Sequence, residues 1–217
     1  EIAANALYNS LPSRSMDADS DIQFTGNSNP ISSGTDLPVE SDGVWKNSYE
    51  LIRRSTYIIE QAEAKPEINA KRYVAEARFF RAMTYYDLLA RYGDVPLIKS
   101  VLSIDSEELK MARTPRSEVV NFIISELKLA VADLPNRSQF KSANELGRIS
   151  KGAANTLMAK VALFEGTWSK YNKGTSNVNE LLTIAKNAAN DVITSNEYAL
   201  YNAEGTSSYR KLFMNPM

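Results

Sequence analysis

The chain has 217 residues, 43% of them apolar and 24% charged, a composition typical of a globular protein with room for one domain or two small ones. Its net charge of −1 creates no overall attraction for nucleic acid or an anionic membrane, so no nucleic-acid partner is expected. The absence of cysteine and histidine excludes disulfides, thiolate nucleophiles, zinc sites built on Cys or His, and a Ser-His-Asp triad.

Two different kinds of sequence precede residue 45. Residues 1–11 have the pattern of a helix end, and Pro12 stops that helix. Residues 12–43 are rich in Ser, Asp, Asn, Gly and Pro and show little periodicity. They predict a long irregular loop, and loops of this length in compact domains tend to be functional or disordered.

The periodicity predicts two helices next, at residues 45–64 and 70–92. The first has a face with residues at spacings of three and four, namely Trp45, Tyr49, Ile52, Thr56 and Ile59. The second has an inward stripe of the same spacing, namely Ala75, Phe79, Ala82, Tyr86 and Leu89. Gly93 closes the second helix, and the next segment is extended because Val95 precedes a proline.

Charges lie on the other face of the helix at 70–92, at Glu76, Arg78 and Arg81. We interpret them as a solvated face or a local ion pair, which stabilises a helix by less than about 0.5 kcal/mol. The large aromatics at core spacing are interpreted as packing residues, namely Trp45, Tyr49, Phe79, Tyr86 and Trp168.

Three further helices are expected. One runs over residues 115–134, with Thr114 as its cap and Pro115 at the first helical position. Its buried stripe is Val120, Ile123, Leu127, Val131 and Leu134. A polar connection, residues 136–149, leads to a helix at 150–171 with the core face Ala154, Leu157, Val161, Phe164 and Trp168. The last helix begins at Asn177 with a capping-box pattern and buries Leu181, Ala185, Ala188 and Val192.

The order of these elements predicts an all-α fold. No window shows the period-two alternation of a strand, so no sheet is expected. The helices pair as 45–64 with 70–92 and as 115–134 with 150–171, which leaves the fifth helix without a partner. This is the pattern of a helical-repeat solenoid with repeats of irregular length.

Several segments between Trp45 and Phe213 match a known family in order and spacing. The most specific are residues 75–82 (AEARFFRA), 85–89 (YYDLL) and 92–97 (YGDVPL). Shorter ones are 45–52 (WKNSYELI), Arg113-Thr114-Pro115 with 133–135 (DLP), Gly147-Arg148-Ile149 with 151–154 (KGAA) and 160–163 (KVAL), and 185–193 (AKNAANDVI). Together these segments resemble the SusD/RagB family.

The resemblance implies tetratricopeptide-like helix pairs that form a right-handed superhelical scaffold. It also implies a lipoprotein on the outer face of the outer membrane, which binds oligosaccharides and passes them to a SusC-like TonB-dependent transporter without catalysis. On this reading residues 1–217 are the family's N-terminal helical region. The lipidated N-terminal anchor and the family's C-terminal part then lie outside the sequence.

No ligand-binding residue can be carried over by motif, so the long loop is the candidate site. It offers the aromatic, carboxylate and amide groups that hold sugars, namely Asp19, Asp21, Phe24, Asn27 and Asn29. The same loop could instead contact the transporter or no ligand at all. A calcium loop starting at Asp17 fails, because Ile22 and Ser28 stand where glycine and glutamate are needed. No phosphate-binding glycine motif is present either, and neither a metal nor a cofactor is expected.

Three other readings stay open. The first is a peptide-binding member of the same uptake family. The second is an intracellular tetratricopeptide-type interaction scaffold, which the irregular repeats and the loop at 12–43 disfavour. The third is a helical-barrel glycosidase, which needs two carboxylates about 5–10 Å apart. Most acidic residues are expected in polar loops or on helix surfaces, so no such pair is nominated and no enzyme activity is expected.

Overall fold

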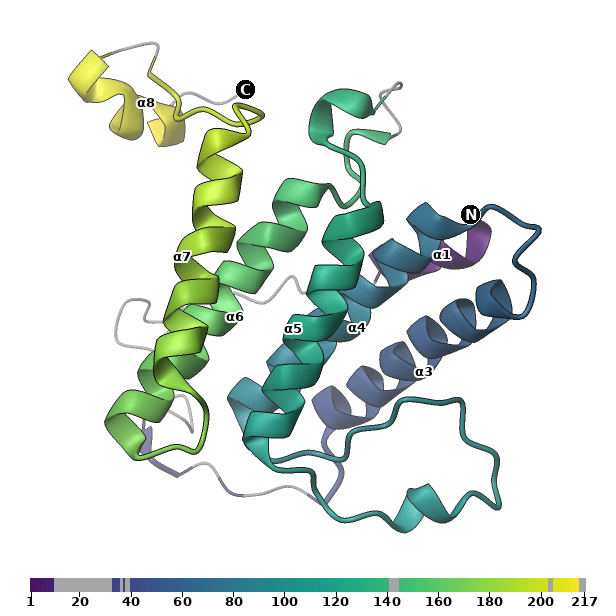
Figure 1. Cartoon of the computed structure of the whole chain (residues 1–217). Helices are drawn as coiled ribbons and strands as arrows, with labels where there is room; N and C mark the ends of the chain where they lie inside the picture. Colours follow the sequence, from purple (N-terminus) through teal and green to yellow (C-terminus); the bar gives the residue numbers. More distant parts are fainter. Residues whose placement is uncertain (10–32, 36, 38–39, 141–144, 203–204, 215–217) are drawn as a thin grey trace.

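The computed structural model describes residues 1–9, 33–35, 37, 40–140, 145–202 and 205–214, and their regular secondary structure is helical apart from one isolated β-bridge (Figure 1). The longer helices are α3 (Gly43–Glu63), α4 (Lys71–Tyr92), α5 (Arg116–Asp133), α6 (Lys151–Asn172) and α7 (Val178–Thr194). The short elements are α1 (Ile2–Tyr8), α8 (Ser208–Met214) and the 3-10 turns η2 (Glu107–Lys110), η3 (Arg137–Gln139) and η5 (Gly205–Ser207). The all-α prediction is confirmed.

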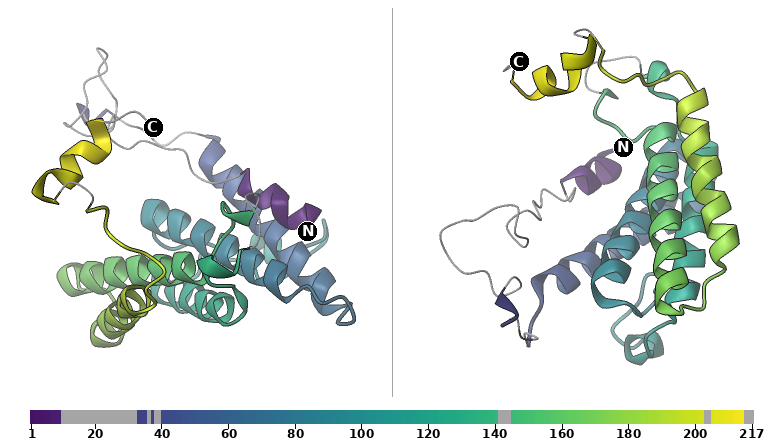
Figure 2. Two further views of the ribbon diagram at one scale, coloured as in Figure 1. Left: turned by 90° about the horizontal axis from the view of Figure 1, so that it is seen from above. Right: turned by 90° about the vertical axis from the view of Figure 1, so that its left-hand side faces the viewer.

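Successive helices pack against each other in chain order and reverse direction each time. α4 packs against both α3 and α5, α6 against both α5 and α7, and α1 against α3 and α4. In Figure 1 the helices α5 and α7 lie in front of α4 and α6, and Figure 2 shows the same stack from above and from the side. Each helix therefore buries a face against its sequence neighbours, as in a helical-repeat protein.

Side-chain caps explain where three helices begin. The carboxylate of Asp42 accepts from the N–H of Val44 at 2.8 Å, and the hydroxyl of Ser150 accepts from the N–H of Ala153 at 3.2 Å. Asn177 accepts from the N–H of Glu180 at 3.3 Å, as its capping pattern predicts. These bonds satisfy N–H groups that the first turn of a helix leaves free.

The start of α5 differs from the prediction. The helix begins at Arg116, and its first N–H donates to Asp94 Oδ1 at 2.8 Å, so Asp94 supplies the cap expected from Thr114. Thr114 instead forms an isolated antiparallel bridge with Val95, the one β pairing within the described ranges. The segment that follows α4 and the segment that precedes α5 are therefore joined by this bridge and by the hydrogen bond to Asp94.

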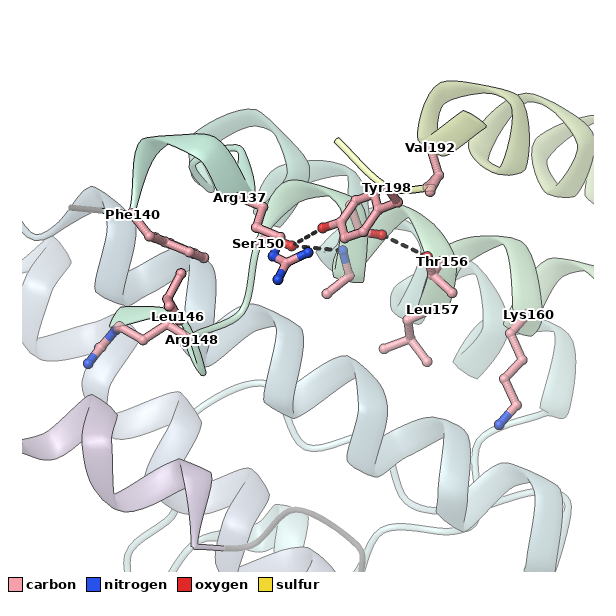
Figure 3. A pocket seen from close by; sticks show the side chains of 12 residues that line it. Arg137, Phe140, Leu146, Arg148, Ser150, Thr156, Leu157, Lys160, Val192 and Tyr198 are labelled. Atoms are coloured by element: carbon pink, nitrogen blue, oxygen red, sulfur yellow. Dashed lines mark hydrogen bonds between the residues drawn. The ribbon is translucent and has the colours of Figure 1, made fainter. Parts of the chain in front are cut away.

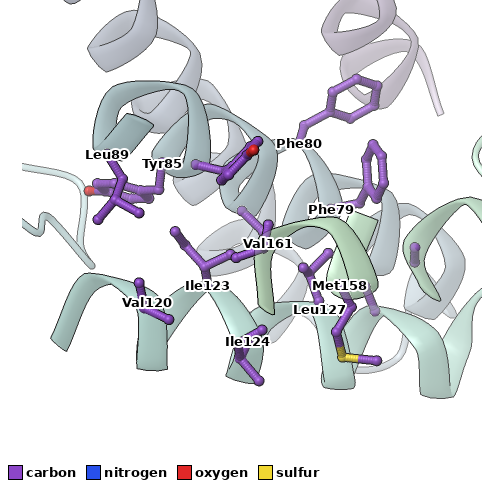
Figure 4. Packing of buried hydrophobic residues seen from close by; sticks show 14 of the residues in the cluster. Phe79, Phe80, Tyr85, Leu89, Val120, Ile123, Ile124, Leu127, Met158 and Val161 are labelled. Atoms are coloured by element: carbon purple, nitrogen blue, oxygen red, sulfur yellow. The ribbon is translucent and has the colours of Figure 1, made fainter. Parts of the chain in front are cut away.

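The core lies between α4, α5 and α6 (Figure 4). The whole predicted stripe of α4 is buried, and Phe80, Tyr85 and Leu88 are fully buried as well, so this helix is covered on most of its circumference. Edge-to-face ring pairs join Tyr8 to Phe80 and Tyr86 to Phe164, with centroids 4.9 and 5.6 Å apart. α4 is the central element of the fold.

The charged face of α4 is not solvated, which corrects the sequence-based interpretation. Glu76 is fully buried and Arg81 is 4% exposed. Arg81 donates from Nε and Nη2 to Glu126 of α5 at 2.9 and 2.6 Å, and Arg78 donates to the other oxygen of Glu126 at 2.7 Å. The partners come from a different helix, because α4 is surrounded and its polar face meets protein instead of water.

Two expectations about α6 and α7 were also wrong. α7 is not without a partner: it packs along α6, and Gly166 of α6 lies against Leu181 and Leu182 of α7. Trp168 does not belong to the core, since it is 36% exposed and its ring stacks on the guanidinium of Arg116, whose Cζ lies 4.1 Å from the centroid. The buried face of α6 is rotated toward α7, because packing on both α5 and α7 widens the face that must be apolar.

Residues 93–115 form a long excursion beside α3 and α4. Its backbone is held by side chains of the two helices. Tyr49 donates to the carbonyl of Pro96 at 2.9 Å, Glu60 accepts from the N–H of Val101 at 2.8 Å, and Tyr85 donates to the carbonyl of Ile98 at 2.9 Å. The half-buried Tyr49 is therefore both a packing residue and an anchor for this segment.

Candidate functional site

An open groove of about 570 Å³ lies along the first turns of α6 (Figure 3). Three segments build it: the connection between α5 and α6, the exposed side of α6, and the chain at and beyond the end of α7. The lining residues are Arg137, Phe140, Leu146, Arg148, Ser150, Gly152, Ala153, Thr156, Leu157, Lys160, Val192 and Tyr198. We call it the α6 groove.

Tyr198 forms one wall of the α6 groove. Its hydroxyl and that of Ser150 are 2.7 Å apart, and its ring lies directly on Gly152. A Cβ at position 152 would lie 2.6 Å from Tyr198 Oη, so only glycine lets the ring come this close. The side chain is 39% exposed, which leaves part of the ring open to the groove.

Hydrogen bonds hold the η3 turn against the segment that carries Tyr198. Asn136 and Gln139 form a capping box around the turn. Glu197 then accepts from the N–H and the hydroxyl of Ser138 at 2.8 and 2.6 Å, and these hydrogen bonds hold the pKa of Glu197 below its ordinary value. The tie sets Arg137 beside Tyr198, with its guanidinium 6.0 Å from the ring centroid.

Arg148 supports the floor of the groove from below. It donates to both carboxylate oxygens of Glu76 at 3.0 and 2.7 Å and to Asn5 Oδ1 of α1 at 2.5 Å. Burial alone would lower the pKa of Arg148, but the hydrogen bonds and negative charge of Glu76 outweigh it and raise that pKa. The guanidinium of Arg148 therefore bonds to other parts of the fold, and it attaches the connection between α5 and α6 to α1 and α4.

The groove offers aromatic edges, hydroxyls and positive charge, and none of the described residues that line it is a carboxylate. Rings and hydroxyls can contact the apolar faces and hydroxyl groups of a sugar. Within the described ranges, no three acidic side chains gather as a metal site. Over the same ranges, no helix has the length and apolar character needed to cross a membrane.

The five residues predicted from the sequence as ligand contacts are not tested by this geometry. Asp19, Asp21, Phe24, Asn27 and Asn29 all lie outside the described residues. The α6 groove was missed because its walls come from segments up to 61 positions apart, here Arg137 and Tyr198. The one available signal was an aromatic within each polar segment, at Phe140 and Tyr198, where no helical core requires one.

The fold defines an all-helical scaffold of tetratricopeptide-like helix pairs with a ligand-sized groove on its surface. A family model described as "Starch-binding associating with outer membrane" matches residues 5–163, most of the chain. The chain therefore belongs to the SusD-like family, as its motifs suggested.

Individual relatives agree with this assignment. The SusD-like protein P2 of Formosa agariphila is 34% identical over 130 residues, which are 58% of this chain and 24% of that protein. A SusD-like carbohydrate-binding protein of Bacteroides fragilis shares the fold with a TM-score of 0.71 and 22% identity, over 93% of this chain and 41% of its own. A structure determined with a xylogluco-oligosaccharide is 29% identical with a TM-score of 0.57, over 74% of this chain and 31% of its own. The chain thus spans about a quarter to two fifths of the length of these proteins.

Proposed function

We propose that this protein binds a glycan at the cell surface and delivers it, uncleaved, to a TonB-dependent transporter of the outer membrane. The observation that carries the proposal is the family match over residues 5–163, whose description names starch binding at the outer membrane. The relative determined with a xylogluco-oligosaccharide supports a glycan as the ligand. On this proposal an N-terminal lipid anchors the protein on the outer face of the outer membrane.

The α6 groove is the proposed contact surface for the glycan. Replacing Tyr198 by alanine removes the ring that forms one wall, and stacking losses of this kind weaken ligands by about tenfold or more. Titration calorimetry of the purified chain with xylogluco-oligosaccharides and malto-oligosaccharides measures the effect. Tyr171→Ala is the matched control, because Tyr171 is equally aromatic, lies on α6 and is 76% exposed outside the groove.

The outcomes separate the alternatives. Saturable glycan binding that Tyr198→Ala weakens and Tyr171→Ala leaves unchanged supports the proposal. Binding of peptides alone would replace the glycan with a peptide, and a cleaved product in the sample would overturn delivery without catalysis. The second result is unexpected because the buried glutamates Glu76, Glu126 and Glu165 are each paired with arginine, not with one another.

The loop at 12–43 stays a second proposed contact, for glycan or for transporter. Deleting residues 17–34 removes Asp19, Asp21, Phe24, Asn27 and Asn29 together. Glycan affinity is measured by calorimetry and transporter affinity by co-purification with the outer-membrane partner. Unchanged values for both would exclude a binding role for these five residues, whereas a loss of one alone would assign the loop to that partner.

A further inference from the structure

The charge of the α6 groove is one-sided. Among the lining residues that the structure describes, three are cations, Arg137, Arg148 and Lys160, and none is an acid, in a protein whose net charge is −1. The charge of Arg148 is already paired with Glu76, to which it donates two hydrogen bonds. Arg137 and Lys160 therefore decide which ligands the groove favours.

Arg137 is exposed at the end of the groove formed by η3 and Tyr198, and it makes no ion pair within the described part of the chain. The nearby carboxylate of Glu197 accepts two hydrogen bonds from Ser138, and the charge of Arg137 adds to lowering the pKa of Glu197 without forming an ion pair with it in the described part of the chain. A planar guanidinium with free N–H groups binds a carboxylate or sulfate through two parallel hydrogen bonds. Arg137 is thus placed to receive an anionic group beside the Tyr198 ring.

Lys160 lies at the other end of the groove. It is eight positions after Gly152 on α6, which corresponds to about 12 Å along a helix axis. Its ammonium is exposed and sits 5.6 Å from the centroid of the Tyr86 ring. Asp87 of α4 interacts electrostatically with this lysine: burial raises the pKa of Asp87 and Lys160 lowers it, so the charge of Lys160 is partly offset, although no ion pair joins the two within the described residues.

We propose that the α6 groove selects acidic oligosaccharides, whose uronate or sulfate groups bind Arg137 and Lys160 while sugar rings lie along Tyr198 and Leu157 between them (Figure 3). The inference rests on the proposed glycan binding and names its substrate class. Two cations at separate places along the groove, one on η3 and one on α6, favour an extended ligand with repeated charges over a single small anion. Close approach of an acidic glycan is also helped by the absence of lining carboxylates, since a like charge there would repel it.

The test is calorimetric titration of the full chain with three ligands of equal length: an oligogalacturonate, a sulfated oligosaccharide and a neutral xylogluco-oligosaccharide. We expect the acidic ligands to bind more tightly, and their affinity to fall as salt rises, because exposed charge pairs are screened. Arg137→Gln and Lys160→Gln should each weaken acidic ligands about tenfold or more and leave the neutral ligand unchanged. Lys170→Gln, an exposed α6 lysine outside the groove, is the control.

Each result has one meaning. Preference for only one of the two acidic ligands identifies uronate or sulfate as the recognised group and supports the inference. Neutral binding that requires Tyr198, with no gain for acidic ligands, overturns the inference and leaves glycan binding intact. Acidic binding that neither glutamine variant weakens, or that inorganic sulfate displaces at equal concentration, also overturns it. Failure of all three oligosaccharides to bind contradicts the proposed function itself.

Discussion

Three glutamates, Glu76, Glu126 and Glu165, are buried, and each accepts hydrogen bonds from an arginine of another segment. Such pairs cost desolvation to form, so their presence alone is no measure of stability. Removing one partner is different, because it leaves a buried charge without compensation. These arginine–glutamate pairs connect α4 to α5, α5 to α6, and α4 to the connection after η3. They therefore restrict how far each helix can shift along its neighbour.

Glu126→Ala tests the first of these pairs. It deprives Arg81 and Arg78 of three hydrogen bonds and should lower the free energy of unfolding by about 3–5 kcal/mol. Glu63→Ala is the control, since Glu63 pairs with the same Arg78 but is largely exposed, and its effect should stay within about 1 kcal/mol. Urea denaturation measures both. Equal midpoints for the two variants would show that burial of the pair contributes nothing.

The tie between Glu197 and Ser138 should depend on pH. Because the hydrogen bonds of Ser138 lower the pKa of Glu197 in the folded state, the tie stabilises the fold above the ordinary glutamate value of about 4.3. This contribution is lost as the pH falls through the lower, folded-state pKa. The protection factor of the Ser138 amide in hydrogen exchange, which is the exchange rate of an unstructured amide at the same pH divided by its own, should therefore drop at acid pH. In Glu197→Gln the same amide should show no such step, and a step that persists would place its cause elsewhere.

At the scale of elements, the local sequence pattern determines where each helix begins and ends, whereas the neighbouring helices determine which of its faces are buried. The predicted stripe of α4 is buried throughout, and that of α5 is buried except at the half-buried Val131, because the helical spacing of apolar residues marks an inward direction. The face of α6 was not, since it packs against both α5 and α7, and Trp168 moved to the edge of the packed surface. Periodicity alone reports one direction per helix and cannot say how wide the covered sector is.

The residue that ends α6 has a left-handed backbone conformation, which residues other than glycine rarely adopt. Lys173 closes the helix with φ 55° and ψ 39°, the left-handed conformation that favours glycine. Lys173→Gly should raise the free energy of unfolding by about 0.5–1 kcal/mol. Lys170→Gly, within the same helix, should lower it by about 1 kcal/mol. Thermal unfolding of the two variants checks the opposite signs, and a loss at both positions would refute the backbone argument.

The whole molecule is held together by contacts between segments far apart in the chain. The excursion at 93–115 is anchored on α3 and α4, and the α6 groove joins the connection after α5 to the chain after α7. A groove of this origin keeps its shape only while the helix stack orders all of its walls. Ligand binding and global stability should therefore be linked.

Tyr85→Phe tests the coupling of the excursion to the stack. The hydroxyl of Tyr85 donates to the carbonyl of Ile98 and accepts from its N–H at 2.9 and 2.8 Å, and burial raises the pKa of Tyr85, so the hydroxyl stays protonated. Its loss should cost about 1–3 kcal/mol and accelerate exchange at the Ile98 amide. Tyr57→Phe is the control on α3, where the side chain is largely exposed. Unchanged exchange at Ile98 would show that other bonds suffice to hold the segment.

The sequence by itself determined the class of fold, the positions of the five longer helices within a residue or two, and the family. These depend on helical spacing, on caps such as Asn177 and on ordered motifs such as residues 92–97, all of which are local in the chain. Among the short helices, α1 ends earlier than expected, at Tyr8, and α8 was not predicted. The tertiary structure decided that Glu76 and Arg81 are buried, that α7 has a partner in α6, and that Arg137 meets Tyr198 across a groove. The physical reason is that burial and site geometry depend on which distant segments pack together, and no periodicity within one segment specifies its neighbour.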